Sequence, residues 1–318
     1  MGVCKKWTVQ MKYGISGWLK PTADTEKSSF FYVSDGLGST ISGMRFRKMS
    51  IETGEEMANV VTRDATRCIY FDGEYIYAFL AKRILKLYRN DLTVAKTYKE
   101  RIPYCADYVA YAGKDTFLLG NHNADSMSLF NVETKQTSRK KIGGCCGIFK
   151  KEQDNFLVFN YDSILEYSPE KNKLAKLADT PKYTECVMEK SGRAYLLCGG
   201  VNYGGPEITS AEYKIPVYSF STEAELERTI SVPQEICSRL RSAMTFRLSE
   251  GEELLYLYDT NNIWIYSVYE DKIVFWHTFP FEESIQNVFT DRSFVITLSR
   301  LKGESDFVYK LSGWKMEI

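Results

Sequence analysis

The residues best suited to recognise a partner are arginines that recur in the segments connecting apolar runs. A guanidinium group binds carboxylate or phosphate through paired hydrogen bonds, and arginine and tyrosine are frequent anchors of protein interfaces. We therefore predict partner binding by Arg63, Arg67, Arg101, Tyr203, Arg239 and Arg241. The alternative, scattered solvated charge that nearby Asp64, Asp107 and Glu185 partly neutralise, is equally compatible with the pattern.

Patterns typical of catalysis are absent from the sequence. It has no GxSxG, no P-loop, no HExxH and no EF-hand loop, and it holds two histidines, His122 and His277. His122 with Asp125 could form a general base oriented by a carboxylate, but a solvated turn explains Asn-His-Asn-Ala-Asp better. We assign no catalytic residue and expect a non-enzyme. An alternative enzyme, a lyase or hydrolase acting on carbohydrate or peptide, would draw on His122, Asp125, Tyr161, Asp162, Tyr203 and Glu207.

Cysteines form a second pattern. Cys105, Cys145, Cys146 and Cys186 each precede a strong apolar run by about ten residues, which suggests soft-metal ligands. No CxxC pair sets a ligand spacing, and small buried residues at a crowded position explain these thiols better. The sequence therefore predicts no metal and no cofactor. It has no secretory signal, so we expect free thiols and a cytoplasmic protein.

Seven similar apolar runs determine the architecture that must position these residues. They start at Phe30, Tyr75, Thr116, Asn155, Ala194, Leu254 and Ser293, with spacings from 39 to 60 residues. A second run follows each of them, usually ending on an aromatic residue before a polar turn. Short β-branched and aromatic runs separated by turn residues are typical of strands.

This period is typical of propeller blades, each a four-stranded antiparallel sheet. We predict an all-β fold, a seven-bladed β-propeller whose ring is closed by the N-terminal strand at residues 5–13. A single domain would span residues 1–318. Its expected blades are 15–62, 63–100, 101–142, 143–180, 181–233, 234–280, and 281–318 with 5–13.

The fifth repeat contains the longest insertion, from Gly199 to Lys214, with four glycines and one proline. Ile164–Glu170 and Ala194–Gly200 resemble kelch repeats, with an apolar strand ending in Gly-Gly and an apolar-x-Tyr strand. The double glycine occurs in one repeat, and the kelch tryptophan is not regularly placed. The resemblance implies a seven-bladed ring whose members are mostly interaction platforms. The insertion is the first candidate for a contact loop, although a neutral surface insertion is the alternative.

Composition restricts the class of partner. The chain carries 41 basic and 41 acidic residues, which argues against general nucleic-acid binding. No apolar run is long enough to span a membrane. We predict a protein-interaction module or scaffold subunit of a complex, with a small-molecule ligand at the channel mouth as an open alternative.

Overall fold

The structure is a computed structural model, and every described element in it is a β-strand or a turn. It describes residues 2–11, 22–23, 29–36, 43–64, 66–80, 83–98, 106–121, 123–151, 154–180, 184–190, 192–198, 213–220, 223–233, 247–250, 254–267, 272–291, 294–301 and 308–317. Within these residues, no helix has the length and hydropathy needed to cross a bilayer.

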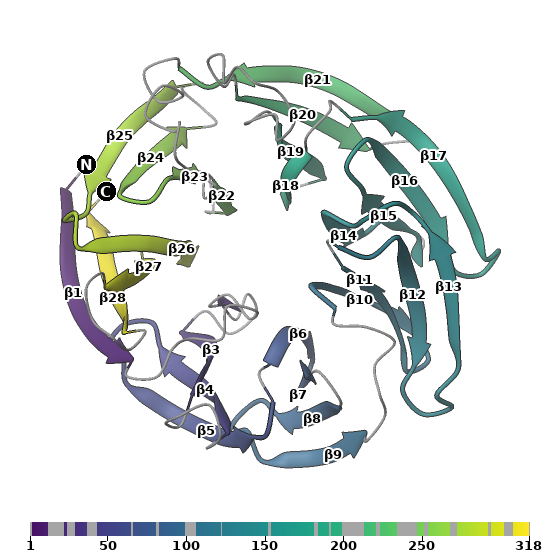
Figure 1. Ribbon diagram of the computed structural model, residues 1–318, viewed down its shortest axis with the longest axis horizontal. Helices are drawn as coiled ribbons and strands as arrows, with labels where there is room; N and C mark the ends of the chain where they lie inside the picture. The colour runs from purple at the N-terminus through teal and green to yellow at the C-terminus, as the bar shows by residue number, and fades with distance from the viewer. Residues whose placement is uncertain are drawn as a thin grey trace, which may run out of the picture. The chain divides into compact units, whose positions relative to one another are not determined.

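The strands form seven four-stranded antiparallel sheets, numbered here as blades in chain order (Figure 1). Blade 1 is β2 (Thr22–Ala23), β3 (Phe30–Gly36), β4 (Met44–Ser50) and β5 (Glu56–Thr62). Blade 2 is β6 (Thr66–Asp72), β7 (Tyr75–Leu80), β8 (Ile84–Tyr88) and β9 (Val94–Tyr98). Blade 3 is β10 (Tyr108–Gly113), β11 (Thr116–Gly120), β12 (Ser126–Asn131) and β13 (Thr137–Lys141).

The remaining blades repeat this order. Blade 4 is β14 (Gly147–Lys150), β15 (Phe156–Phe159), β16 (Ser163–Ser168) and β17 (Lys173–Asp179). Blade 5 is β18 (Thr184–Lys190), β19 (Arg193–Cys198), β20 (Lys214–Phe220) and β21 (Ala224–Ser231). Blade 6 is β22 (Arg247–Glu250), β23 (Leu254–Tyr258), β24 (Asn262–Ser267) and β25 (Lys272–Thr278). Blade 7 is β26 (Glu283–Asp291), β27 (Phe294–Leu301), β28 (Tyr309–Glu317) and β1 (Gly2–Met11).

Seven such sheets are the fold of a seven-bladed β-propeller, as the repeat spacing predicted. By their internal contacts the residues divide into two compact units. One unit is Met1–Cys105 with Ser249–Ile318, and the other is Ala106–Leu248. The predicted blade boundaries and the prediction of one domain both stay predictions.

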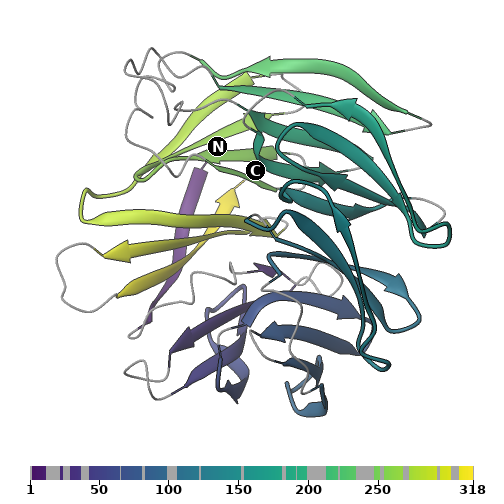
Figure 2. The same cartoon turned by 45° about the vertical axis from the view of Figure 1, so that its right-hand side comes forward.

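The N-terminal strand completes the last blade, as predicted. β1 pairs antiparallel with β28 from Gly2↔Glu317 to Met11↔Tyr309 (Figures 1 and 2). The ring of Trp7 stacks on Phe31 of blade 1, with centroids 6.0 Å apart. The first strand of the chain therefore closes blade 7 and also joins that blade to blade 1.

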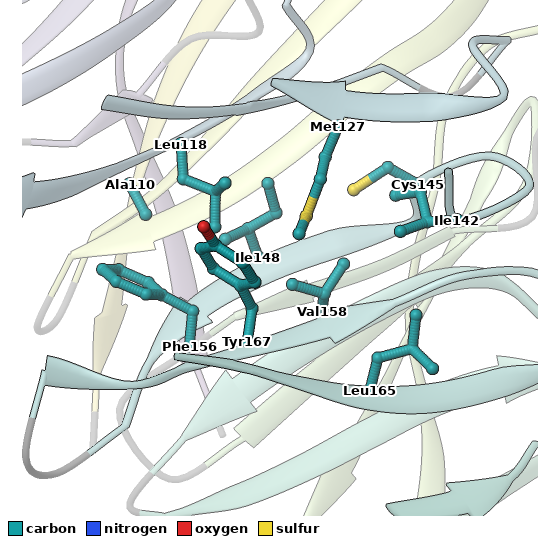
Figure 3. Close-up of a cluster of buried hydrophobic side chains, with 10 residues drawn as sticks. All are labelled: Ala110, Leu118, Met127, Ile142, Cys145, Ile148, Phe156, Val158, Leu165 and Tyr167. Carbon is teal, nitrogen blue, oxygen red and sulfur yellow. The ribbon is translucent and has the colours of Figure 1, made fainter. Parts of the chain in front are cut away.

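Within each unit, cores lie between neighbouring blades because each strand turns alternate side chains to its two neighbours. Between blades 3 and 4, Leu118 and Met127 meet Ile148, Phe156 and Val158 (Figure 3). The adjacent Cys145 and Cys146 divide between two such cores, one on each side of blade 4. They thus behave as the small apolar residues that the sequence suggested.

β-Bulges occur in the outer strands of six blades. In each of them the register of residue pairs skips one residue of the outer strand: Met57, Ala95, Leu177, Glu227, Trp276 and Lys6. A bulge bends and twists an edge strand, which hinders pairing with another chain. β13 of blade 3 differs, because its described pairing with β12 has no register shift.

Candidate partner-binding face

Two types of loop lie at the same edge of the sheets. One type joins the second and third strands of a blade, and the other joins its fourth strand to the next blade. Within each unit we call this edge the loop face. The two types are joined by main-chain hydrogen bonds of 2.7–2.9 Å: Ile142 N to Asp125 O, Thr180 N to Asp162 O, and Phe279 N to Asn261 O.

Asn160 organises the loop face of blade 4. Its side chain is buried, 6% exposed. The Nδ2 group donates to the carbonyl of Ile142 at 2.6 Å, and Oδ1 accepts from the main chain of Asp162 and from both N–H and hydroxyl of Ser163. One amide thus holds the loop and the preceding connection together, so the backbone of this face is fixed.

Asp259 and Asn261 join the corresponding loop and connecting segment of blade 6. Asp259 Oδ1 accepts from the main-chain N–H groups of Asn261 and Asn262, each at 2.7 Å. The Asn261 amide donates to the carbonyls of Pro280 and Glu283. The described loops of both units are therefore fixed by buried or half-buried Asx side chains, which gives neighbouring exposed residues defined positions.

Two of the six predicted partner-binding residues lie in the described structure. Arg63 is exposed in the bend after β5, as expected. Arg67 lies inside β6 and is half-buried, so its predicted place in a connecting loop was wrong. The nearby Asp64 pairs with Arg83 over 3.8 Å, a guanidinium that the sequence analysis had not selected. Arg101, Tyr203, Arg239 and Arg241 lie outside the described residues.

A bulge explains the position of Arg67. β6 pairs with β7 at Thr66↔Leu80 and Cys68↔Phe79, so the register of residue pairs skips Arg67. β18 has the same shift between Thr184 and Cys186. Bulges of this kind change the direction of a side chain and often occur near binding sites. Both bulges occur in a Thr-x-Cys sequence. Strand prediction from the sequence does not find them, because they shift the strand pairing by only one residue.

Tyr161 is an exposed aromatic side chain on the loop face of the second unit, 37% exposed. Burial raises its pKa, and the neighbouring Cys146, Cys145 and Asp107 add to the effect. The thiol of Cys145 is fully buried and its pKa is raised by burial, so this sulfur stays protonated at neutral pH. A protonated, enclosed thiol is a packing group and a poor nucleophile.

Three residues of the alternative catalytic set, Asp125, Tyr161 and Asp162, lie in the described structure. All three side chains are exposed. His122, Tyr203 and Glu207 lie outside the described residues. Among the described residues, no three His, Cys, Asp or Glu side chains are close enough to hold a metal ion.

His277 lies on the outer strand β25 and is half-buried. Its ring centroid is 4.9 Å from Phe279 and 5.0 Å from Trp314. Burial lowers its pKa, Lys5 lowers it further, and Glu283 acts in the opposite direction. The bulge at Trp276 turns both Trp276 and His277 toward blade 7.

The fold and the loop face define the class of this chain as a seven-bladed β-propeller. Its sequence matches no family model, and no curated protein matches it. Solved structures share the fold. The WD40 domain of Neurospora crassa Pan2 is 8% identical with a TM-score of 0.65, covering 99% of this chain and 96% of that one.

Two further structures show how widely the fold is distributed. Kuenenia stuttgartiensis hydrazine synthase is 9% identical with a TM-score of 0.62, over 90% of this chain and 94% of that one. U3-55K is 9% identical with a TM-score of 0.59, over 98% of each chain. These identities show the fold alone, and one of the proteins is an enzyme by name, so the fold does not determine the activity.

Proposed function

We propose that this chain is a protein-interaction module that binds a partner protein through its loop face. The proposal rests on the hydrogen bonds that join the two types of loop at one edge of the sheets. The bond from the Asn160 amide to the carbonyl of Ile142 is an example. Fixed loops reduce the entropy lost when a partner binds. Arg63 is exposed on the loop face of the first unit, and Tyr161 and Asp162 are exposed on the loop face of the second. Charged and aromatic side chains of these kinds are typical of interfaces.

The predicted contact residues outside the described structure belong to this proposal. Arg101, Tyr203, Arg239 and Arg241 fall in segments that the sequence places on the same loop face. The kelch-like character of blades 4 and 5 stays a prediction, because Gly199 and Gly200 lie outside the described residues. The cytoplasmic location also stays a prediction of the sequence.

The test is capture of partners from the native source, followed by mass spectrometry. We expect Arg63→Glu, and separately the pair Arg239→Glu with Arg241→Glu, to remove the captured partner while thermal stability stays close to that of the unmodified protein. The matched control is Lys272→Glu, which changes an exposed charge at the opposite edge of blade 6. Equal capture by all of these variants would refute the proposal.

A further inference from the structure

The outer strand of blade 3 is an unusually regular free edge. β13 pairs with β12 from Ser126↔Lys141 to Phe130↔Thr137 without a register shift. The described outer strands of the other six blades each contain a bulge. β13 is the last strand of its sheet, and four of its five residues are exposed. It therefore lacks the bulge that hinders pairing of the other six outer strands with another chain.

Two main-chain hydrogen bonds show which groups of β13 point outward. Asn131 N donates to Gln136 O at 3.0 Å, and Ile142 N donates to Asp125 O at 2.8 Å. In an antiparallel pair, hydrogen-bonded and non-hydrogen-bonded positions alternate. Residues 138 and 140 therefore bond inward to β12. The main-chain N–H and C=O groups of Thr137, Arg139 and Lys141 point away from the sheet.

The same strand is basic. Arg139 and Lys141 are exposed and form no ion pair with any described residue. Lys140 turns to the other side of the sheet and donates to the carbonyl of Asn172 in blade 4. No acidic residue occurs in Thr137–Lys141. Arg139 and Lys141 thus carry both exposed positive charges and outward-pointing main-chain N–H and C=O groups.

We propose that β13 is a second binding surface, separate from the loop face, that takes an extended acidic segment of a partner protein as a fifth antiparallel strand. Outward N–H and C=O groups supply the strand pairing. Acidic side chains of the partner segment, opposite Arg139 and Lys141, determine which partner binds. Opposite charges across paired strands are favourable, and like charges are not. Repulsion between like charges also disfavours pairing of β13 with the β13 strand of a second copy of the chain.

The experiment uses the whole chain and a fluorescently labelled synthetic peptide of alternating glutamate and valine. We expect saturable binding by fluorescence anisotropy, and at least about tenfold weaker binding when lysine replaces glutamate in the peptide, from the loss of several charge pairs. A peptide N-methylated at alternate residues on one edge should also bind at least about tenfold more weakly, because each methyl group removes a ladder donor.

Four protein variants, two tests and two controls, assign the binding to β13. Thr137→Pro removes an outward N–H and leaves the inward ladder intact, and Arg139→Gln with Lys141→Gln removes the charges. Both should weaken binding, whereas Lys173→Gln on the bulged β17 and Arg63→Glu on the loop face should not. Binding that is insensitive to Thr137→Pro and to N-methylation, or equal binding of a single-stranded DNA of the same charge, would overturn the proposal. Because Arg63→Glu is a control here, failure of this proposal leaves that of the loop face unaffected.

Discussion

The indole Nε1 of Trp7 donates a hydrogen bond to the main-chain oxygen of Ile51 over 2.8 Å. Trp7 belongs to β1, the strand that completes blade 7, while Ile51 follows β4 of blade 1. The ring also lies flat against two glycines, where a Cβ at Gly313 would lie 2.2 Å and one at Gly54 2.5 Å from ring atoms. One side chain therefore joins the two blades, and two positions without side chains make room for it.

We predict that Gly313→Ala lowers the free energy of unfolding by about 1–3 kcal/mol, because the added methyl group overlaps the Trp7 ring. The same substitution in a Trp7→Ala background should cost less than about 0.5 kcal/mol, because the obstructing ring is gone. Urea denaturation of the four proteins in this double-mutant cycle measures both values. An equal penalty in both backgrounds would show that Gly313 acts independently of Trp7.

Asn160→Ala should destabilise the loop face of blade 4. It leaves the Ile142 carbonyl and the Ser163 N–H without their partner, at about 1–3 kcal/mol for each buried group. Asn123→Ala, at an exposed position in the corresponding loop of blade 3, should change stability by less than about 0.5 kcal/mol. Urea midpoints decide the comparison, and similar midpoints for the two variants would contradict the role given to Asn160.

His277 should make stability depend on pH. Its pKa in the folded chain is lowered from 6.5 by burial and by Lys5, so the unfolded chain binds a proton that the folded chain does not. Stability contributed by neutral His277 is therefore complete above the unfolded pKa and decreases as pH falls below about 6.5.

The measurement for His277 is the urea midpoint between pH 7.5 and pH 5.5. His277→Gln should lose less stability than the unmodified protein over this interval. Because the variant retains the carboxylates of the chain, their titration cancels in the comparison. Identical pH profiles would show that protonation of His277 is not coupled to folding.

Thiol labelling should separate the cysteines by burial. Cys4 is half-buried on β1, whereas Cys68, Cys145, Cys146 and Cys198 are buried. We expect iodoacetamide at pH 8 to modify Cys4 in the folded protein and to modify Cys145 only after denaturation, since its raised pKa and burial both suppress the thiolate. Peptide mass spectrometry with time gives the order. Early alkylation of Cys145 would contradict its enclosed position.

The sequence predicted the strands well because their pattern is local. Runs such as Tyr75–Leu80 are apolar, β-branched or aromatic, and turn residues bound them, so β7 is evident without a structure. The closing strand was also predictable, since the segment around Trp7 had no partner nearby in the sequence. Both strands are recognisable from the types of residue within segments of six to ten positions.

Register and distant contacts were not predictable in the same way. The bulges at Arg67 and Trp276 depend on which residues lie opposite, and that is a property of the strand pair. Arg67 was consequently placed in a loop, and the packing of His277 against blade 7 was not predicted. The Asx residue that ends several second strands, such as Asn160, was visible in the sequence, but its hydrogen bonds to the connecting segment required the structure.

Pairing of the first strand with the last has a consequence for synthesis on the ribosome. Thr8 and Ser312, whose hydroxyl groups are 3.1 Å apart, are separated by 304 positions. At about 5–20 residues per second, β1 emerges roughly 15–60 s before its partner strand exists. During that interval the edge of β1 and the side of the Trp7 ring that faces Gly313 lack their native neighbours, and the nascent chain depends on chaperones or on its own solubility until β28 has been synthesised.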